Sequence, residues 1–498
     1  MKTLSWILVL GLAMVSSQAE DAAKTRAVSL QDCLQEALAH NLDLQIERIT
    51  PQISLYNLRG SYAGWDPNFS ISGAHNYSLS GGGLDPNTKL PSPASISDSD
   101  SFTTGLGGVL PWGTTYDLFG NISEAYGQIS TNNFDNARGA IGINLTQPLL
   151  KNFLIDGTRF SIAVSKNRLK YSEQGLRGRV MDTVTSVEKA YYDLIAAREN
   201  VKVQVKALQL ADQLRSENKK RVEVGTLAPL DEKQSESQVA ARRSDVLSAR
   251  QVLAASQNAL KSLLSDNYRQ IHEVELEPTE AMAAPAQIFN VQDSWGKGLT
   301  QRPELIQAKL DAERQGIQLK YDRNRIFPEL DLTGSYGHSA GGAGIAEFSQ
   351  GFDQLERGNQ PFYSYGARLT VPLNNRAARN SYKASKLANE QILLALKKTE
   401  QGILTQIDNA VIGARVSLER VGSTHEARRY AEAALDAEEK KLQNGKSTSF
   451  VVLQLQRDLT AARSEEIRAL ADYNKSLADL ARSEGSTLDR RAINVEVK

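Results

Sequence analysis

Two parts of the chain alternate apolar and polar side chains with a period of two residues. Residues 68–79 and 330–336 do so clearly, and a second alternating stretch follows each of them. Successive side chains of a strand point to opposite faces of its sheet, so this pattern predicts strands with one apolar and one polar face. We expect these strands within residues 66–148 and 327–373.

Long helical segments follow the predicted strands. Residues 157–222 and 376–442 contain no proline, and at ~1.5 Å per residue each would form a helix on the order of 100 Å long. Shorter helical segments are expected at residues 30–62 and 231–264. Apolar residues spaced by three, four or seven predict coiled-coil packing of the shorter helices; these positions are Val239, Val246, Leu253, Leu260, Leu470, Tyr473, Leu477 and Leu480.

The chain contains an internal repeat. Residues 32–44 align without a gap with residues 293–305, and Gly225 corresponds to Gly445. Each copy follows the order helix, strands, long helix, turn and helix. The repeat therefore predicts two structural units of one plan; they cover residues 20–277 and 293–485, with a linker at 278–292 and a C-terminal tail at 486–498.

The first copy carries an insertion between its strands. The offset between matching residues falls from 261 at Asp32 and Asp293 to 224 at Gly142 and Gly366, so the first copy holds 37 additional residues. Apolar and polar residues alternate on both sides of its short segment Pro111-Trp112-Gly113-Thr114. This pattern predicts a second hairpin at about residues 104–122.

The N-terminus is typical of a secretory signal peptide at residues 1–19. Lys2 is followed by an apolar stretch and a small residue, Ala19, suited to cleavage. A membrane anchor is disfavoured because the apolar stretch is shorter than the roughly 20 residues of a spanning helix. The lone Cys33 indicates neither a lipid anchor nor a disulfide, and we expect it to fill the core. No comparable apolar run follows, so a closed β-barrel is the structure by which this exported chain could cross a membrane.

The sequence offers no constellation for catalysis. Lysine plus arginine and aspartate plus glutamate number 58 each, which gives no net field to attract nucleic acid. The five histidines are scattered singly, and the glycine clusters at 81–83 and 341–342 lack the lysine and the serine or threonine of a phosphate-binding loop. We therefore expect no enzyme activity, no cofactor and no metal.

The segments of this chain, taken in their order along the sequence, resemble those of the TolC-like outer membrane factor family. The opening VSLQDCLQEALAHNLDL is similar to the family's opening helix, with Leu42 where proline is usual and Pro303 retaining that proline in the second copy. Residues 221–231 and 442–450 resemble the family's periplasmic hairpin tips. The resemblance covers residues 28–485.

The resemblance implies an α+β fold in which a homotrimer shares one membrane β-barrel, continued by a long periplasmic α-helical coiled-coil barrel. It implies a passive channel in the cell outer membrane for tripartite efflux or type I secretion. Its partners would be outer-membrane lipid, a periplasmic adaptor and, through the adaptor, an inner-membrane transporter. The alternative is a soluble periplasmic coiled-coil scaffold or adaptor.

Three groups of site residues follow from the resemblance and the strand pattern. We expect the two tips to bind the adaptor, residues just past the tips to gate the periplasmic entrance, and one face of the strands to contact lipid. The tip residues are Val224, Gly225, Thr226, Leu227, Asn444, Gly445, Lys446 and Ser447; the gate residues are Asp231, Phe450, Val451 and Gln454; the lipid-facing residues are Phe69, Ile71, Leu145, Leu330, Leu332 and Leu369.

Two departures from the family leave open questions. The family often closes its entrance with carboxylate rings, but Val451 and Gln454 stand at those positions, which favours apolar gating by Phe450 and Val451. The inserted hairpin either adds two strands to each protomer, giving eighteen in a trimer, or folds over or into a twelve-stranded barrel. In the first arrangement Trp112 would lie at the periplasmic interface of the membrane.

Overall fold

The computed structural model describes residues 25–84, 87, 89, 91–129, 132–226, 228–342 and 344–494. The predicted signal peptide lies outside these residues. The chain forms two compact units. One contains the residues up to Leu44, Asp182–Phe289 and Ala410–Arg482; the other contains Gln45–Met181, Asn290–Asn409 and the residues from Ser483 onward. Each unit therefore takes pieces from both copies of the repeat.

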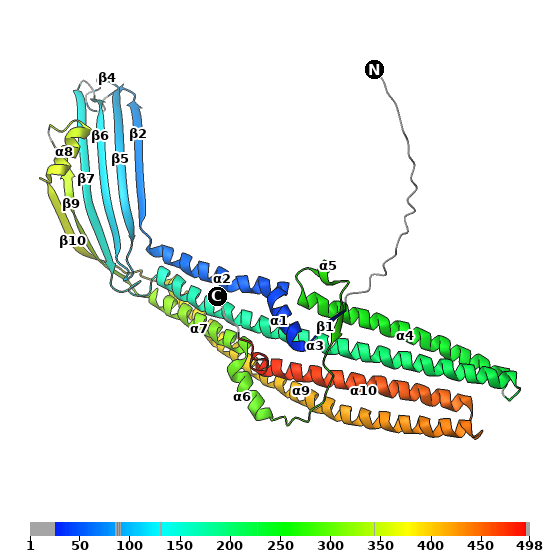
Figure 1. Cartoon of the computed structure of the whole chain (residues 1–498). Helices are drawn as coiled ribbons and strands as arrows, with labels where there is room; N and C mark the ends of the chain where they lie inside the picture. Colours follow the sequence, from blue (N-terminus) through cyan, green and yellow to red (C-terminus); the bar gives the residue numbers. More distant parts are fainter. Residues whose placement is uncertain are drawn as a thin grey trace, which may run out of the picture. The chain divides into compact units, whose positions relative to one another are not determined.

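The second unit contains a six-stranded antiparallel sheet in the order β2, β5, β6, β7, β9, β10 (Figure 1). Neighbours in the sheet are also successive strands of this set along the chain. The strands are β2 (Asn68–Ser80), β5 (Ser95–Val109), β6 (Thr115–Ile129), β7 (Asn132–Pro148), β9 (Glu329–Ala340) and β10 (Pro361–Thr370), and a small separate pair is formed by β3 (Gly83–Leu84) and β4 (Pro91–Ser92).

The inserted hairpin belongs to this sheet. Its two strands, β5 and β6, pair from Val109 and Thr115 to Ile96 and Gln128, and they lie between β2 and β7. The tight turn between them closes by hydrogen bonds from Leu110 N–H to the Thr114 carbonyl and from Gly113 N–H to the Leu110 carbonyl, each 2.8 Å long. Of the two alternatives for the insertion, the protomer therefore adopts the one with two additional strands.

The register of the strands gives the sheet two different faces. Paired residues of antiparallel strands lie on the same face, and the pairs Phe69–Leu106, Leu106–Leu118, Leu118–Ile143 and Ile143–Tyr336 run across the sheet. We call this the apolar face. The positions between them carry serine, threonine, asparagine and glycine for the most part and form the polar face, for example Ser70, Ser72, Gly105, Asp117, Asn144 and Ser335.

Helices of both repeats complete the second unit. They are parts of α2 (Leu42–Ser61), α3 (Gly157–Glu223) and α9 (Arg376–Gln443), with α6 (Val291–Gln301), α7 (Pro303–Asn324), α8 (Phe348–Arg357), α11 (Thr487–Arg490) and the 3₁₀ turn η1 (Tyr62–Trp65). Gly298 of α6 lies against Ile407 of α9, whose Cδ1 atom would clash with a Cβ added at this glycine. The Trp295 indole N–H donates to Asp408 of the same helix at 2.9 Å. These contacts fix α6 on α9.

The first unit is a helical assembly closed by a short parallel pair of strands. It contains β1 (Thr25–Val28), β8 (Glu275–Pro278), α1 (Leu30–His40), α4 (Pro229–Leu264), α5 (Tyr268–Ile271), most of α10 (Ser449–Glu484) and the remaining parts of α3 and α9. Of the expected coiled-coil positions, Leu253 and Leu470 are half-buried and the other six are buried. The apolar spacing thus identifies the packed sides of α4 and α10.

The extent predicted for the helix at residues 30–62 is wrong. The structure breaks residues 30–62 into α1 and α2 at Asn41, whose backbone is extended at φ −63° and ψ 122°. The Asn41 side chain accepts from the Leu44 N–H at 3.2 Å and donates to the Leu263 carbonyl at 3.1 Å. It therefore acts as a helix cap. The second copy has the same break at Arg302, immediately before Pro303.

Cys33 is fully buried in α1. Burial raises the pKa of its thiol from 9.0 to about 12, so the reactive thiolate should be about a thousandfold scarcer than for an ordinary cysteine at neutral pH. We expect the folded protein to resist alkylation by iodoacetamide at pH 8, while the urea-unfolded chain reacts readily, as followed by intact mass. Equal rates for the two states would place Cys33 outside the core.

Candidate functional site

Both turns between the paired long and short helices have the same backbone structure. In the first, Gly225 has φ +78°, its N–H donates to the Val222 carbonyl at 2.9 Å, and the Thr226 N–H donates to the Arg221 carbonyl at 2.8 Å. This is a Schellman motif, in which a residue of positive φ ends the helix. Glycine suits that position because it has no Cβ to clash.

The second turn repeats this geometry. Gly445 has φ +70°, its N–H donates to the Leu442 carbonyl at 3.1 Å, and the Lys446 N–H donates to the Lys441 carbonyl at 2.9 Å. The Ser447 hydroxyl donates to Glu438 at 2.6 Å. The hydrogen bonds from Lys441 and from Ser447 lower the pKa of that carboxyl. The two predicted tips are therefore two copies of one turn.

The predicted tip residues are mostly exposed. Val224 is 73% exposed, and the other described tip residues are exposed except Ser447, which is half-buried. Leu227 lies outside the described residues. Val224 is therefore an exposed apolar residue immediately after α3.

A buried polar cluster joins the two turns, and its residues form no pattern that distinguishes them in the sequence. Asn218 of α3 is fully buried; its amide donates to the Ser235 hydroxyl of α4 at 2.7 Å, and its carbonyl oxygen accepts from the Ser449 hydroxyl of α10 at 2.9 Å. Ser235 in turn donates to the Asp231 carbonyl at 2.8 Å. Because buried polar groups are costly when unpaired, this cluster favours one relative position of α3, α4 and α10 near the turns.

An apolar cluster packs beside it. Leu214 of α3, Leu435 of α9 and three residues of α10, Val452, Leu453 and Leu459, form one buried apolar cluster. Both clusters hold the ends of the two helical hairpins together as one body within the first unit. The packing of these helix ends thus supports both turns.

The predicted gate residues lie on the outer side of α10 and at the start of α4. Phe450 is 63% and Val451 39% exposed, whereas the next residue, Val452, points into the apolar cluster. Gln454 is exposed and donates to Asp458 at 3.3 Å, and Asp231 is half-buried in the first turn of α4. Phe450, Val451 and Gln454 are therefore not part of the protomer's own core.

The six predicted lipid-facing residues share the apolar face of the sheet. The register connects Leu330 with Leu369, and Leu145 with Tyr116 and Gly334. Phe69, Ile71, Leu145, Leu332 and Leu369 are among the exposed large apolar side chains of the protomer, with Ile71 74% exposed, and Leu330 is half-buried. An apolar surface of this extent marks an interaction with lipid or protein.

Among the described residues, no helix is both long and apolar enough to cross a membrane. Over the same part of the chain, no three or more histidine, cysteine, aspartate or glutamate side chains are grouped so that they could hold a metal ion.

Comparison with known proteins gives a consistent result. A family model described as "Outer membrane efflux protein" matches residues 114–265 and 296–486. The chain is 24% identical over 365 residues to "Outer membrane protein TolC" of Vibrio cholerae, covering 71% of this chain and 78% of the relative. It is 22% identical over 311 residues to "Pyoverdine export outer membrane protein OpmQ" of Pseudomonas aeruginosa, covering 60% of each. The outer-membrane channel OprN has a similar fold, with a TM-score of 0.68, 15% identity and coverage of 92% of this chain and 90% of that one.

Proposed function

Because the chain belongs to the outer membrane efflux protein family, we propose that it is the outer-membrane channel of a tripartite efflux or type I secretion system. The channel would be a trimer and would conduct the exported compound passively. The family works in general with adaptor and inner-membrane transporter partners. The observation that carries the proposal is the continuous apolar face of a sheet whose other face is polar. Lipid on one side and water on the other would satisfy both faces.

The edges of the sheet support assembly. In the described part of the chain, β2 and β10 each pair with a neighbour on one side only. Unpaired backbone groups are costly in lipid, so both edges need partners there. The six strands alternate in direction, and β2 and β10 therefore run opposite to each other. The β10 edge of one protomer can pair with the β2 edge of the next, and three protomers would give an eighteen-stranded barrel.

The two tips are the proposed docking site for the adaptor. Three observations support this proposal. The two turns have the same backbone structure, the polar and apolar clusters hold the helices that carry them, and the turns expose residues such as Val224. A photo-reactive residue at Thr226 or Lys446 should cross-link to a periplasmic adaptor in cells, and mass spectrometry of the adduct would name it. Release of the whole protein by osmotic shock without detergent would instead favour the soluble scaffold.

Gating is expected to depend on apolar contact among protomers at Phe450 and Val451. Val451→Asp should place one carboxylate per protomer at the constriction, raise its affinity for cations and add block by divalent cations. Single-channel conductance in planar bilayers measures both effects. Val451→Asn is the matched control of equal shape without charge. Unchanged conductance and no block in Val451→Asp would mean that the narrowest point lies elsewhere.

A further inference from the structure

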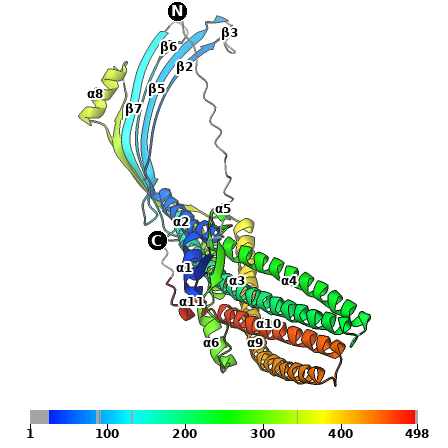
Figure 2. The same ribbon diagram turned by 45° about the vertical axis from the view of Figure 1, so that its right-hand side comes forward.

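Helix α8, in the connection between β9 and β10, packs on the apolar face of the sheet. Its Phe348 ring lies edge-on to Phe102 of β5 at 5.6 Å between centroids. At Gly351 an added Cβ would be 3.0 Å from the Ile122 side chain of β6, and Leu355 approaches Gly139 of β7 closely. Figure 2 shows α8 on the outer, convex side of the bowed strands. The helix thus crosses several strands rather than following one.

The helix lies where the apolar face ends. Along β6 this face presents Tyr116, Leu118, Gly120 and Ile122, a distance of ~20 Å at about 3.4 Å per residue, and then Glu124. Glu124 accepts a hydrogen bond from the Phe348 N–H, the first of α8, at 3.2 Å. Its carboxylate therefore caps the positive end of the helix dipole at the apolar-to-charged boundary.

The sequence of α8 suits such a boundary. Phe348, Phe352 and Leu355 recur at intervals of four and three residues on the side of the sheet, where Gly351 also lies, while the remaining positions hold serine, glutamine and charged residues. The helix ends at Gly358, which has φ +62°. A helix with one apolar and one strongly polar side lies in the plane of a membrane interface.

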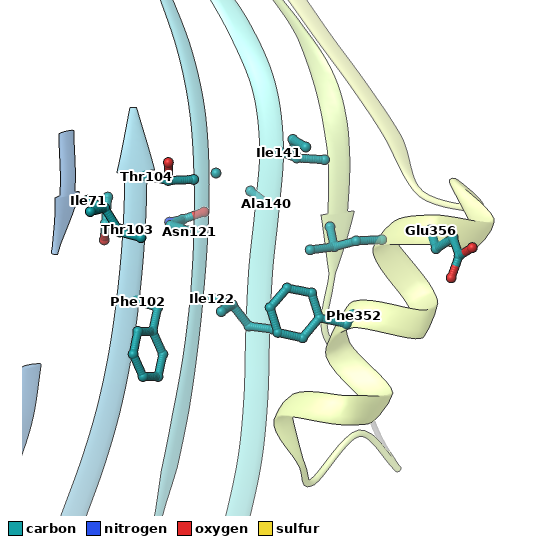
Figure 3. A pocket seen from close by; sticks show the side chains of 12 residues that line it. Ile71, Phe102, Thr103, Thr104, Asn121, Ile122, Ala140, Ile141, Phe352 and Glu356 are labelled. Carbon is teal, nitrogen blue, oxygen red and sulfur yellow. The ribbon is translucent and has the colours of Figure 1, made fainter. Parts of the chain in front are cut away.

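An open apolar cleft of about 580 Å³ separates part of α8 from the sheet (Figure 3). Its walls include Ile71, Phe102, Ile122 and Ile141 from four different strands and Phe352 from α8. Phe352 is 57% exposed, and Figure 3 shows its ring lying over the strand surface near Ile122. The volume lies in the range of about 300–1,000 Å³ that holds small ligands.

We propose that this cleft binds an acyl chain of an outer-leaflet membrane lipid, with α8 lying at the level of the headgroups. The inference rests on the proposed function, because the cleft continues the face that lipid would cover. An exported solute would travel along the opposite, polar face. The side chains that wall the cleft are mainly apolar, with Glu356 of α8 among the lining residues, which suits a hydrocarbon chain whose polar end emerges beside the helix.

Photo-cross-linking at three positions tests the proposal in the full-length protein in outer-membrane vesicles. Benzoylphenylalanine replaces Phe352 in the cleft, Leu332 on the apolar face away from α8, or Phe119 on the polar face. The protein is then extracted from the vesicles. Half of each sample is washed extensively with detergent to remove loosely bound lipid, and all samples are irradiated afterwards. Adducts are identified by mass spectrometry.

We expect lipid adducts at positions 352 and 332 in unwashed samples, each about tenfold above position 119, because lipid chains do not enter a water-filled lumen. After washing, the adduct at 352 should persist while that at 332 is lost. Loss of both together, or an adduct at 352 to a second copy of the chain, would overturn the acyl-chain site. Absence of lipid adducts at both 332 and 352 in unwashed samples would overturn the proposed function itself.

Discussion

Arginine in place of Ile71 or Leu332 should prevent the protein from accumulating in the outer membrane. Both side chains lie on the apolar face and are more than half exposed in the protomer, at 74% and 52%. A charged residue on the lipid face of a barrel costs ~2–4 kcal/mol at the bilayer midplane and less near the interfaces. The measurement is the amount of heat-resistant oligomer in detergent extracts of outer membranes.

The matched control is Ser72→Arg, one residue from Ile71 on the polar face. There the guanidinium would meet water, so membrane yield should stay close to that of the unchanged protein. If Ile71→Arg and Leu332→Arg assemble as well as Ser72→Arg, the strands do not face lipid.

Valine in place of Gly225 and of Gly445 should abolish export while leaving the oligomer in the membrane. Both glycines have positive φ, at +78° and +70°. An L-residue in this region costs roughly 1–2 kcal/mol, and more when its side chain is β-branched. The strain should displace the exposed turns that we propose as the docking site, while the strands lie in the other structural unit. Export is measured as cellular resistance to, or efflux of, a transported compound.

Asparagine at the same two positions provides the control, because its side chain tolerates positive φ. Gly225→Asn and Gly445→Asn should retain most of the export. Full export by both valine variants would remove the tips from the mechanism, whereas loss of the oligomer in those variants would show that the turns are needed for folding.

The regular elements could be predicted from the sequence because their patterns are long. The expected segments 157–222 and 376–442 correspond to helices 157–223 and 376–443, and the alternation on both sides of Pro111 identified the inserted hairpin. The break at Asn41 was missed because Leu42 replaces the proline that marks the same break at Pro303. Helix boundaries set by a side-chain cap leave little periodic signal.

The contacts at the site could not be predicted in the same way. Asn218, Ser235 and Ser449 are ordinary polar residues in helical segments, and their association depends on how three helices pack. Helix α8 did leave a signal in the sequence, the spacing of Phe348, Phe352 and Leu355. Assembly would join the sheet edges of two copies of the chain. The pattern of residues within one chain does not specify this pairing.

The most direct test of the account is the structure of the purified protein in a lipid nanodisc by electron cryomicroscopy. We predict three copies around one channel, with β10 of each protomer hydrogen-bonded to β2 of the next and the inserted strands β5 and β6 in the wall. The residues of the apolar face, among them Leu145 and Leu369, would contact lipid. A monomer outside the lipid disc, or an oligomer in which the apolar faces pack against each other, would contradict it.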